Sequence, residues 1–311
     1  MKRDYSNSIL VVTGSGGFLG KSFMKLLDKN KFKEVREISS KEYDLRDPIK
    51  AREAIKEADY IVHMAGITGG IDWIKRHPGS SFYDNIMINT NVFQVAMENN
   101  VKRMVVIGSV CSYPKITETP FKEDNLWDGH PEEVNAPYGH AKRMAVVQSD
   151  AYNKQYGLSS QVLLLTNMYG PNDTFDLNRS HVVPALIVKF MEALKDKLNK
   201  VTLWGDGSPT RDFFFVEDAA KAILHSLDSD SIIPINIGSG RETSIKELAE
   251  TMKSLIKRVD IEWDTSKPNG QPRRFLDITK AKTEIGFEPE YSLEDGLKKT
   301  IEWYKENIFE V

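Results

Sequence analysis

The feature that most constrains this 311-residue chain is a glycine-rich segment near its beginning. Residues 14–20 read Gly-Ser-Gly-Gly-Phe-Leu-Gly and separate a β-branched run at 9–13 from a helical pattern that continues to Leu27. Glycines at this spacing let the backbone approach a pyrophosphate, and the first turn of the following helix offers free N–H groups. A flexible turn is the alternative, but the flanking strand and helix favour a dinucleotide site. We therefore expect the following residues to bind a cofactor: Gly14, Ser15, Gly16, Gly17, Phe18, Leu19 and Gly20.

Strand and helix patterns alternate through the first half of the chain. Further strands are expected at residues 35–38, 60–63, 104–107 and 162–165. Helices are expected over residues 84–99 and from Pro137, where a missing N–H is tolerated. The alternation predicts an α/β fold with a Rossmann-type doubly wound parallel sheet, with ligands at the carboxyl ends of its strands. The residues expected there are Ala65, Gly66, Ile107, Gly108 and Asn167.

The regular alternation of strands and helices ends after Gly170, and short strands, loops and helices follow in no regular order. We expect two interleaved units. Residues 1–165 plus about 211–241 would form an NAD(P)-binding Rossmann domain, and about 166–210 plus 242–311 would form a smaller α/β substrate lobe.

The residues after the second strand bear on the choice of dinucleotide. An acid at this place binds the ribose 2′-hydroxyl of NAD. This chain instead has Ser39, Ser40 and Lys41, which suit a 2′-phosphate. We therefore expect NADP(H), with NAD(H) as the alternative because no arginine is present there. Asp44 and Leu45 are expected near the adenine, although Asp44 could instead cap a helix before Pro48.

Three polar residues form a candidate catalytic group. Ser109 follows the fourth strand, and Tyr138 and Lys142 are four residues apart, so they share one face of a helix. An ammonium near a phenol favours the phenolate and would bring the pKa of Tyr138 toward neutral. Such a group can move a proton on or off a carbinol oxygen, with an ordinary amphipathic helix as the alternative.

Composition excludes several classes of protein. Hydrophobic residues make up 40% of the chain and charged residues 28%, with a net charge of −3 and a single cysteine. We expect a globular cytoplasmic protein with a polar amino terminus, no disulfide, no metal site and no nucleic-acid or membrane partner. No apolar run reaches the ~18–20 residues that span a bilayer.

These motifs together resemble the extended short-chain dehydrogenases/reductases that act on nucleotide sugars, and within that group the GDP-L-fucose synthases. The most specific matches are Ser-x-Cys-x-Tyr-Pro from Ser109 and Ser-His-Val-x-Pro-Ala from Ser180. The matching segments are residues 65–70, 108–115, 136–139, 166–171, 180–186, 204–205 and 266–268.

The resemblance implies a two-stage reaction. Such enzymes invert C3 and C5 of GDP-4-keto-6-deoxy-D-mannose and then reduce C4 with NADPH to give GDP-L-fucose. Cys111 would be the base and His181 the acid, Ser109 would bind the C4 oxygen, and Tyr138 would protonate it. Lys142 would lower the pKa of Tyr138 and hold the nicotinamide ribose; Tyr138 and His181 would also contact the cofactor. A buried small side chain is the alternative for Cys111, and a polar residue at a helix entry is the alternative for His181.

The resemblance also implies substrate contacts and an assembly. Lys189, Trp204 and Arg211 match positions that hold the nucleotide diphosphate sugar, with lysine at 189 where the family usually has arginine. Gly16 likewise replaces an arginine of the glycine loop. The two long helices expected from Asp84 and Pro137 would pair in a homodimer. Further candidate substrate contacts, with surface charge or capping as the alternative, are Arg273, Arg274 and Asp277.

Two other functions fit the same scaffold. One is a pure 4-reductase or 4-epimerase of another nucleotide sugar, and the other is a non-catalytic dinucleotide-sensing protein. The residues do not decide the nucleotide base, or whether the sugar is a hexose or a heptose.

Overall fold

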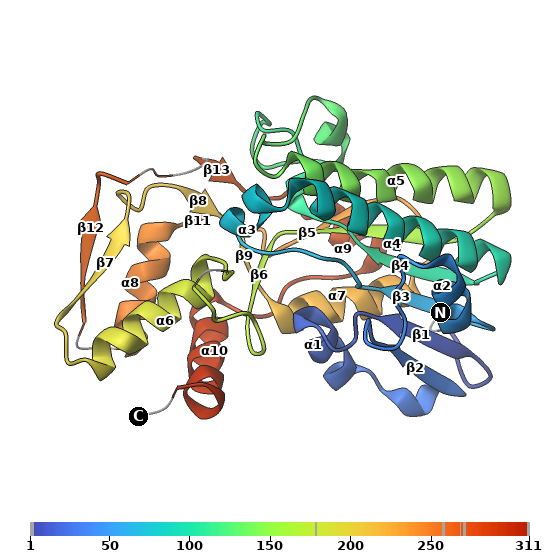
Figure 1. Cartoon of the computed structure of the whole chain (residues 1–311), viewed down its shortest axis with the longest axis horizontal. Helices are drawn as coiled ribbons and strands as arrows, with labels where there is room; N and C mark the ends of the chain where they lie inside the picture. Colours follow the sequence, from blue (N-terminus) through green and yellow to red (C-terminus); the bar gives the residue numbers. More distant parts are fainter. Residues whose placement is uncertain (1–2, 178, 257–258, 268, 270–271, 310–311) are drawn as a thin grey trace.

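A six-stranded parallel sheet forms the centre of the molecule (Figure 1). The computed structural model describes residues 3–177, 179–256, 259–267, 269 and 272–309, so Pro268, within one of the matching segments, lies outside them. The strand order is β2-β1-β3-β4-β5-β10. The strands are β1 (Ile9–Thr13), β2 (Glu34–Ile38), β3 (Tyr60–His63), β4 (Arg103–Ile107), β5 (Ser160–Leu165) and β10 (Ile235–Ile237). The predicted doubly wound parallel sheet is confirmed.

Helices cover both faces of the sheet, and the inner strands β1, β3, β4 and β5 are buried on both sides. Along β1, Ile9 and Val11 pack in the core beneath one helical layer, while Leu10 and Val12 pack beneath the other. The first layer contains α2 (Pro48–Ile55), α4 (Pro78–Glu98) and α5 (Ala136–Tyr156). The second contains α1 (Phe18–Leu26), α7 (Val216–Asp228) and α9 (Thr279–Ile285).

The chain reverses its direction of winding between β1 and β3, which are neighbours in the sheet. The connection from β1 leads outward to β2, and the next connection crosses back to β3. The loops that leave the carboxyl ends of β1 and β3 therefore diverge, and in open α/β sheets the ligand crevice lies at such a switch point.

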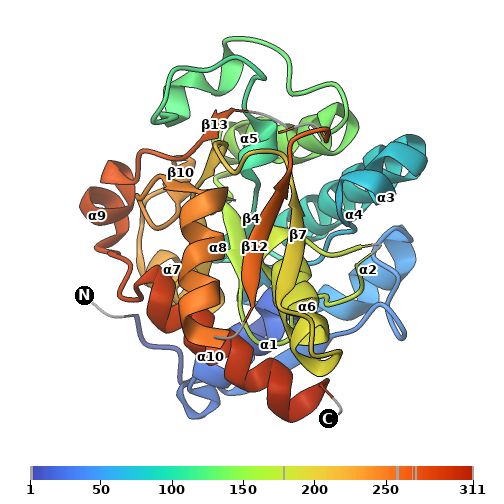
Figure 2. The same cartoon turned by 90° about the vertical axis from the view of Figure 1, so that its left-hand side faces the viewer.

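A smaller lobe lies beyond the carboxyl edge of the sheet (Figures 1 and 2). Its core is built by α6 (Val182–Lys195), α8 (Ile245–Ile256) and α10 (Leu293–Asn307). Short strands pair as β6 (Asn167–Tyr169) with β9 (Phe213–Phe215), and as β7 (Lys200–Trp204) with β12 (Asp260–Asp264). A third sheet joins β11 (Thr243–Ser244), β8 (Thr210–Arg211) and β13 (Arg273–Arg274).

The remaining elements are short. They are α3 (Ile71–Arg76) and the 3₁₀ turns η1 (Lys29–Lys31), η2 (Val110–Ser112) and η3 (Glu123–Trp127). Among the described residues, no helix has the length and apolar character needed to cross a bilayer. The cytoplasmic location stays a prediction.

The division into 1–165 plus 211–241 and 166–210 plus 242–311 also stays a prediction. One part of the second unit packs on the sheet: Ala281, Ile285 and Phe287 join the core cluster that contains α1 and α7. The last part of the chain thus contacts both the sheet and the lobe.

Candidate active site

The glycine loop holds its shape through two close backbone approaches. Gly14 has φ +71°, and a Cβ there would lie 2.8 Å from the Ala65 nitrogen. A Cβ on Gly20 would lie 2.1 Å from the Gly14 oxygen, whereas one on Gly16 would meet no atom within 4 Å. Gly17 precedes α1, and no side chain caps the helix there. The first N–H groups of α1 therefore face a loop without bulky side chains, which fits the pyrophosphate of a dinucleotide.

A buried hydrogen-bonded chain fixes the loop after β3. The Ala65 N–H donates to Thr13 Oγ1 (3.2 Å), and Thr13 Oγ1 lies 2.7 Å from His63 Nδ1. His63 Nε2 lies 3.0 Å from Asn89 Oδ1, and because an amide oxygen only accepts, Nε2 carries the proton. Burial lowers the pKa of His63 to about 3, with a smaller effect from the charge of Lys142. His63 is thus a neutral structural residue.

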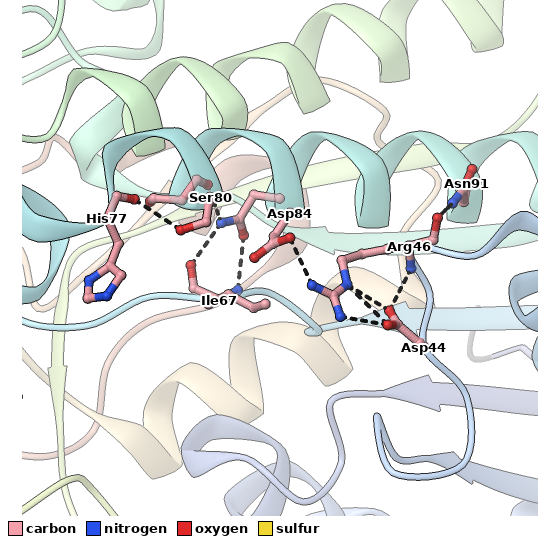
Figure 3. A network of polar contacts seen from close by, with 9 residues as sticks. Asp44, Arg46, Ile67, His77, Ser80, Asp84 and Asn91 are labelled. Carbon is pink, nitrogen blue, oxygen red and sulfur yellow. Dashed lines mark hydrogen bonds and ion pairs between the residues drawn. The ribbon is translucent and has the colours of Figure 1, made fainter.

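Asn85 of α4 clamps the next residues of the same loop. Its amide accepts from the Ile67 N–H (3.1 Å) and donates to the Ile67 carbonyl (2.8 Å), so Ile67 is held against the helix (Figure 3). A Cβ on Gly66 would lie 3.0 Å from Asn85 Oδ1 and 3.2 Å from Lys142 Nζ. Gly66 therefore lets this loop, α4 and Lys142 meet at one point.

The residues expected near the adenosine end lie on the loop between β2 and α2. Ser39 is half-buried, while Ser40 and Lys41 are exposed. Leu45 is buried in the core beneath α4. These four positions follow β2, at the crevice edge of the sheet.

Asp44 forms an ion pair with Arg46 and does not cap the helix before which it lies, which was the alternative role for it. Arg46 reaches Asp44 at 2.6 Å and Asp84 of α4 at 3.0 Å, so two carboxylates share one guanidinium (Figure 3). The cap of α2 is Asp47, which accepts from the Ile49 and Lys50 N–H groups. The proposed contact of Asp44 with adenine stays a prediction.

The loop after β4 brings Ser109 and Cys111 beside the first turn of α5. Ser109 Oγ accepts from the Cys111 N–H at 3.1 Å and so fixes the η2 turn. Cys111 is half-buried. A Cβ on Gly139 would lie 2.3 Å from the Cys111 oxygen, so only glycine lets α5 approach this turn so closely.

Tyr138 and Lys142 both lie on α5, as their spacing suggested, and both side chains are buried. Burial raises the pKa of Tyr138, and the neighbouring Cys111 raises it further, while hydrogen bonding to Thr68 and Ser109 opposes this. Burial also lowers the pKa of Lys142 to about 8. The ammonium donates to the Ile107 carbonyl at 2.9 Å and lies 6.0 Å from the Tyr138 ring centroid. Burial therefore dominates the pKa of Tyr138, and the expected lowering of that pKa by Lys142 stays a prediction.

His181 opens α6 at the lobe side of the same crevice. It occupies the position before the helix, is exposed, and makes no capping bond through its side chain. Nearby protein atoms nevertheless desolvate the imidazole enough to lower its pKa. The Gly70 N–H donates to the Arg179 carbonyl at 3.0 Å, so the loop that carries Thr68 also contacts the segment before His181.

Asn167 begins β6, where the sheet gives way to the lobe, and is half-buried. Its Nδ2 is buried without a hydrogen-bond partner among the described residues. An unpaired buried amide costs free energy, so a ligand that accepts from it would stabilise the site.

The lobe presents an aromatic surface between two lysines. Trp204 is 65% exposed, and the ammonium groups of Lys189 and Lys267 lie 5.6 and 5.8 Å from its ring. Burial lowers the pKa of Lys189. A flat, cation-flanked ring suits a nucleobase and its phosphates.

Arg211 lies beside Arg274, because β8 and β13 pair in parallel with these residues in register. Burial lowers the pKa of Arg211 to about 10, and the charge of Arg274 contributes to the shift. Two neighbouring half-buried cations favour an anionic ligand.

The other two candidate substrate residues have partners within the protein. Arg273 forms an ion pair with Glu242 at 2.6 Å, and Asp277 accepts from the Thr279 N–H at 2.9 Å at the start of α9. Both contacts match the alternatives of surface charge and capping. Their contact with substrate stays a prediction.

Sequence reasoning missed Thr68, Asn85 and Asn89. The two asparagines are four residues apart and so share one face of a helix, and that spacing was the available signal. Thr68 offered none, because its contact with Tyr138 depends on how the loop after β3 meets α5.

Comparison with known proteins places this geometry in context. Residues 10–238 match the NAD dependent epimerase/dehydratase family. A GDP-L-fucose synthase of Escherichia coli (strain K12) is 33% identical, with 97% of this chain and 98% of that protein covered. A GDP-6-OMe-4-keto-L-xylo-heptose reductase from C. jejuni superimposes with TM-score 0.88 and 28% identity over 96% of this chain and 98% of the other. A GDP-L-fucose synthetase from Naegleria fowleri bound to NADP has TM-score 0.87 and 27% identity, over 97% and 95%.

Proposed function

The chain belongs to the NAD dependent epimerase/dehydratase family, and we propose that it converts GDP-4-keto-6-deoxy-D-mannose to GDP-L-fucose by C3/C5 epimerisation and C4 reduction. NADP(H) is the cofactor, as in the relative bound to NADP. The observation that carries the proposal is the cluster of Ser109, Cys111 and Tyr138 at the end of β4. In this cluster the Cys111 thiol, which can take a proton, lies near the Tyr138 phenol, which can donate one to an oxygen.

Inversion needs a base on one face of the sugar and an acid on the other. Cys111 would take the proton next to the ketone, and His181 would return one to the opposite face. Negative charge would then develop on the C4 oxygen. Ser109 Oγ accepts from the Cys111 N–H and also lies within hydrogen-bond reach of Tyr138, so its O–H would turn from the phenol to donate to the C4 oxygen when substrate binds.

Reduction needs a proton for the same oxygen. The cofactor would supply the hydride. The raised pKa of Tyr138 keeps the phenol protonated at neutral pH, which is the form that can donate. Lys142, held by the Ile107 carbonyl beneath Gly66, would orient the ribose and balance the phenolate left after transfer.

Substrate would be held from the lobe side. Trp204 would stack on the base, while Lys189 and Arg211 would face the diphosphate. Lysine is a point charge without the planar fork of arginine, so the attraction between Lys189 and the diphosphate would depend less on direction.

A homodimer is part of this proposal. Helices α4 and α5 pack against each other and form the outer surface of one layer. They carry large exposed apolar side chains: Phe82, Tyr83, Val147 and Tyr156. Val147→Glu should convert a dimer to a monomer in light scattering after gel filtration, while an unchanged mass would reject this surface.

The reductase from C. jejuni supports a second candidate, a reductase that leaves the stereocentres unchanged on a GDP-linked heptose. The experiment is to incubate the protein with NADPH and either GDP-4-keto-6-deoxymannose or a GDP-4-keto-heptose, then identify products by NMR. GDP-L-fucose with oxidised cofactor would support the first proposal. A reduced but uninverted sugar would support the second, and no oxidation with either substrate would reject both.

A further inference from the structure

An arginine from the lobe reaches the sulfur of the chain's single cysteine. Arg274 lies on the two-residue strand β13, and its Nη1 is 3.8 Å from Cys111 Sγ. Its Nη2 is 3.4 Å from a carboxylate oxygen of Glu132. The side chains of Arg274 and Glu132 are only 12% and 26% exposed, so water screens this group weakly.

The other charged or titratable groups around the thiol come from α5, the turn before it, and β8. Tyr138 on α5 is close enough for a charge on Cys111 to raise its pKa. Glu132 precedes α5 and holds the far side of the guanidinium. Arg211 of β8 lies next to Arg274 and adds a second positive charge. Positive charge therefore predominates on the lobe side of the sulfur, and a neutral phenol faces it from α5.

We propose that Arg274 is a positioning residue for the base of the inversion, and this inference rests on the proposed function. The guanidinium holds the Cys111 sulfur in place and stabilises its negatively charged form. The thiolate then takes a proton from the sugar carbon, giving a neutral thiol and an enolate, while His181 supplies a proton to the opposite face. Exchange with solvent returns both groups to their starting forms. Arg274 stays charged throughout and offsets the negative charge as it moves from sulfur to the enolate.

The same contact ties the lobe to the catalytic loop. Cys111 lies on the turn after β4, whereas Arg274 lies 163 residues later in the chain. Inversion therefore requires the lobe to be seated against the sheet domain. Proton transfer in the reduction step uses Tyr138 and Lys142 of α5 and does not require Arg274.

The test compares Arg274→Gln and Arg274→Lys with Arg52→Gln. Arg52 also pairs with a glutamate, Glu98 at 3.0 Å, but lies on α2 away from the cysteine. The first readout is the pH dependence of iodoacetamide alkylation of Cys111 in protein saturated with NADP. We expect the midpoint for Arg274→Gln to move up by about one pH unit or more, with Arg274→Lys between it and the wild type. Arg52→Gln should match the wild type.

The second readout is incorporation of deuterium from D₂O into GDP-4-keto-6-deoxymannose. We expect Arg274→Gln to slow exchange at pH 7 at least tenfold and to recover part of the loss at higher pH, which a structural defect would not do. An alkylation profile that matches the wild type would overturn the inference. If the wild type exchanges no deuterium, the proposed function fails, but the alkylation profile still decides the role of Arg274.

Discussion

Replacing Gly20 by alanine tests the geometry of the cofactor loop. The added Cβ would lie 2.1 Å from the Gly14 carbonyl oxygen and 2.6 Å from the Ser15 oxygen, both backbone atoms. Ordinary contact begins near 3.4 Å, so the backbone must move by more than 1 Å. Overpacking of this kind costs about 1–3 kcal/mol, and the better helix propensity of alanine recovers at most ~1 kcal/mol. We expect Gly20→Ala to lower the free energy of unfolding by about 1–2 kcal/mol.

The matched control is Gly16→Ala, because a Cβ at Gly16 meets no atom within 4 Å. Urea denaturation should place this variant within about 0.5 kcal/mol of the wild type. Fluorescence titration with NADPH should show a Kd for Gly20→Ala at least about tenfold higher than that of the wild type, since each 1.4 kcal/mol is a factor of ten. Equal stability of the two variants would refute the close approach of Gly20 to Gly14.

Four further predictions concern single side chains. Tyr138→Phe should reduce NADPH oxidation by about 10²–10⁴-fold while deuterium exchange continues, and equal loss of both would reject separate roles. Trp204→Ala should raise KM with little change in kcat or in stability, because the ring is mostly exposed. Lys142→Met should abolish reduction yet raise the free energy of unfolding at pH 7 by about 1–3 kcal/mol, since it removes an ammonium that burial disfavours. Between pH 8 and 10.5 the unfolded wild type binds more protons than the folded state, so wild-type stability should rise with pH there and that of the variant should not. By the same rule, neutral His63 should make the wild type lose stability as the pH falls from 6.5 toward 3, and His63→Gln should lose less in acid denaturation.

Local patterns predicted the sheet because each strand and helix shows its own periodicity. The predicted strand at residues 60–63 has the same bounds as β3, and the β-branched run at 9–13 has those of β1. The role of the glycine loop could also be predicted from the sequence, since it depends on the strand and helix that flank the loop directly.

Contacts between residues far apart in the chain could not be predicted from the sequence. Strands β8 and β13 have two residues each and join positions more than 60 residues apart, so neither shows a period of its own. They carry Arg211 and Arg274, and the contact of Arg274 with Cys111 depends on that pairing.

The burial of side chains also could not be predicted from the spacing of residues. The four-residue interval between Tyr138 and Lys142 correctly indicated one helix face, but it could not show that both side chains are enclosed. Desolvation then sets the pKa of each group, and Lys142 gives its hydrogen bond to Ile107. The result is a protonated phenol, which suits reduction.

The central claim is that one crevice performs inversion through Cys111 and reduction through Tyr138. The most direct test incubates Cys111→Ser and Tyr138→Phe with GDP-4-keto-6-deoxymannose and NADPH in D₂O, and follows deuterium at C3 and C5 by NMR. The account predicts loss of exchange in Cys111→Ser with NADPH binding intact, and continued exchange without reduction in Tyr138→Phe. Exchange that continues unchanged in Cys111→Ser would contradict it.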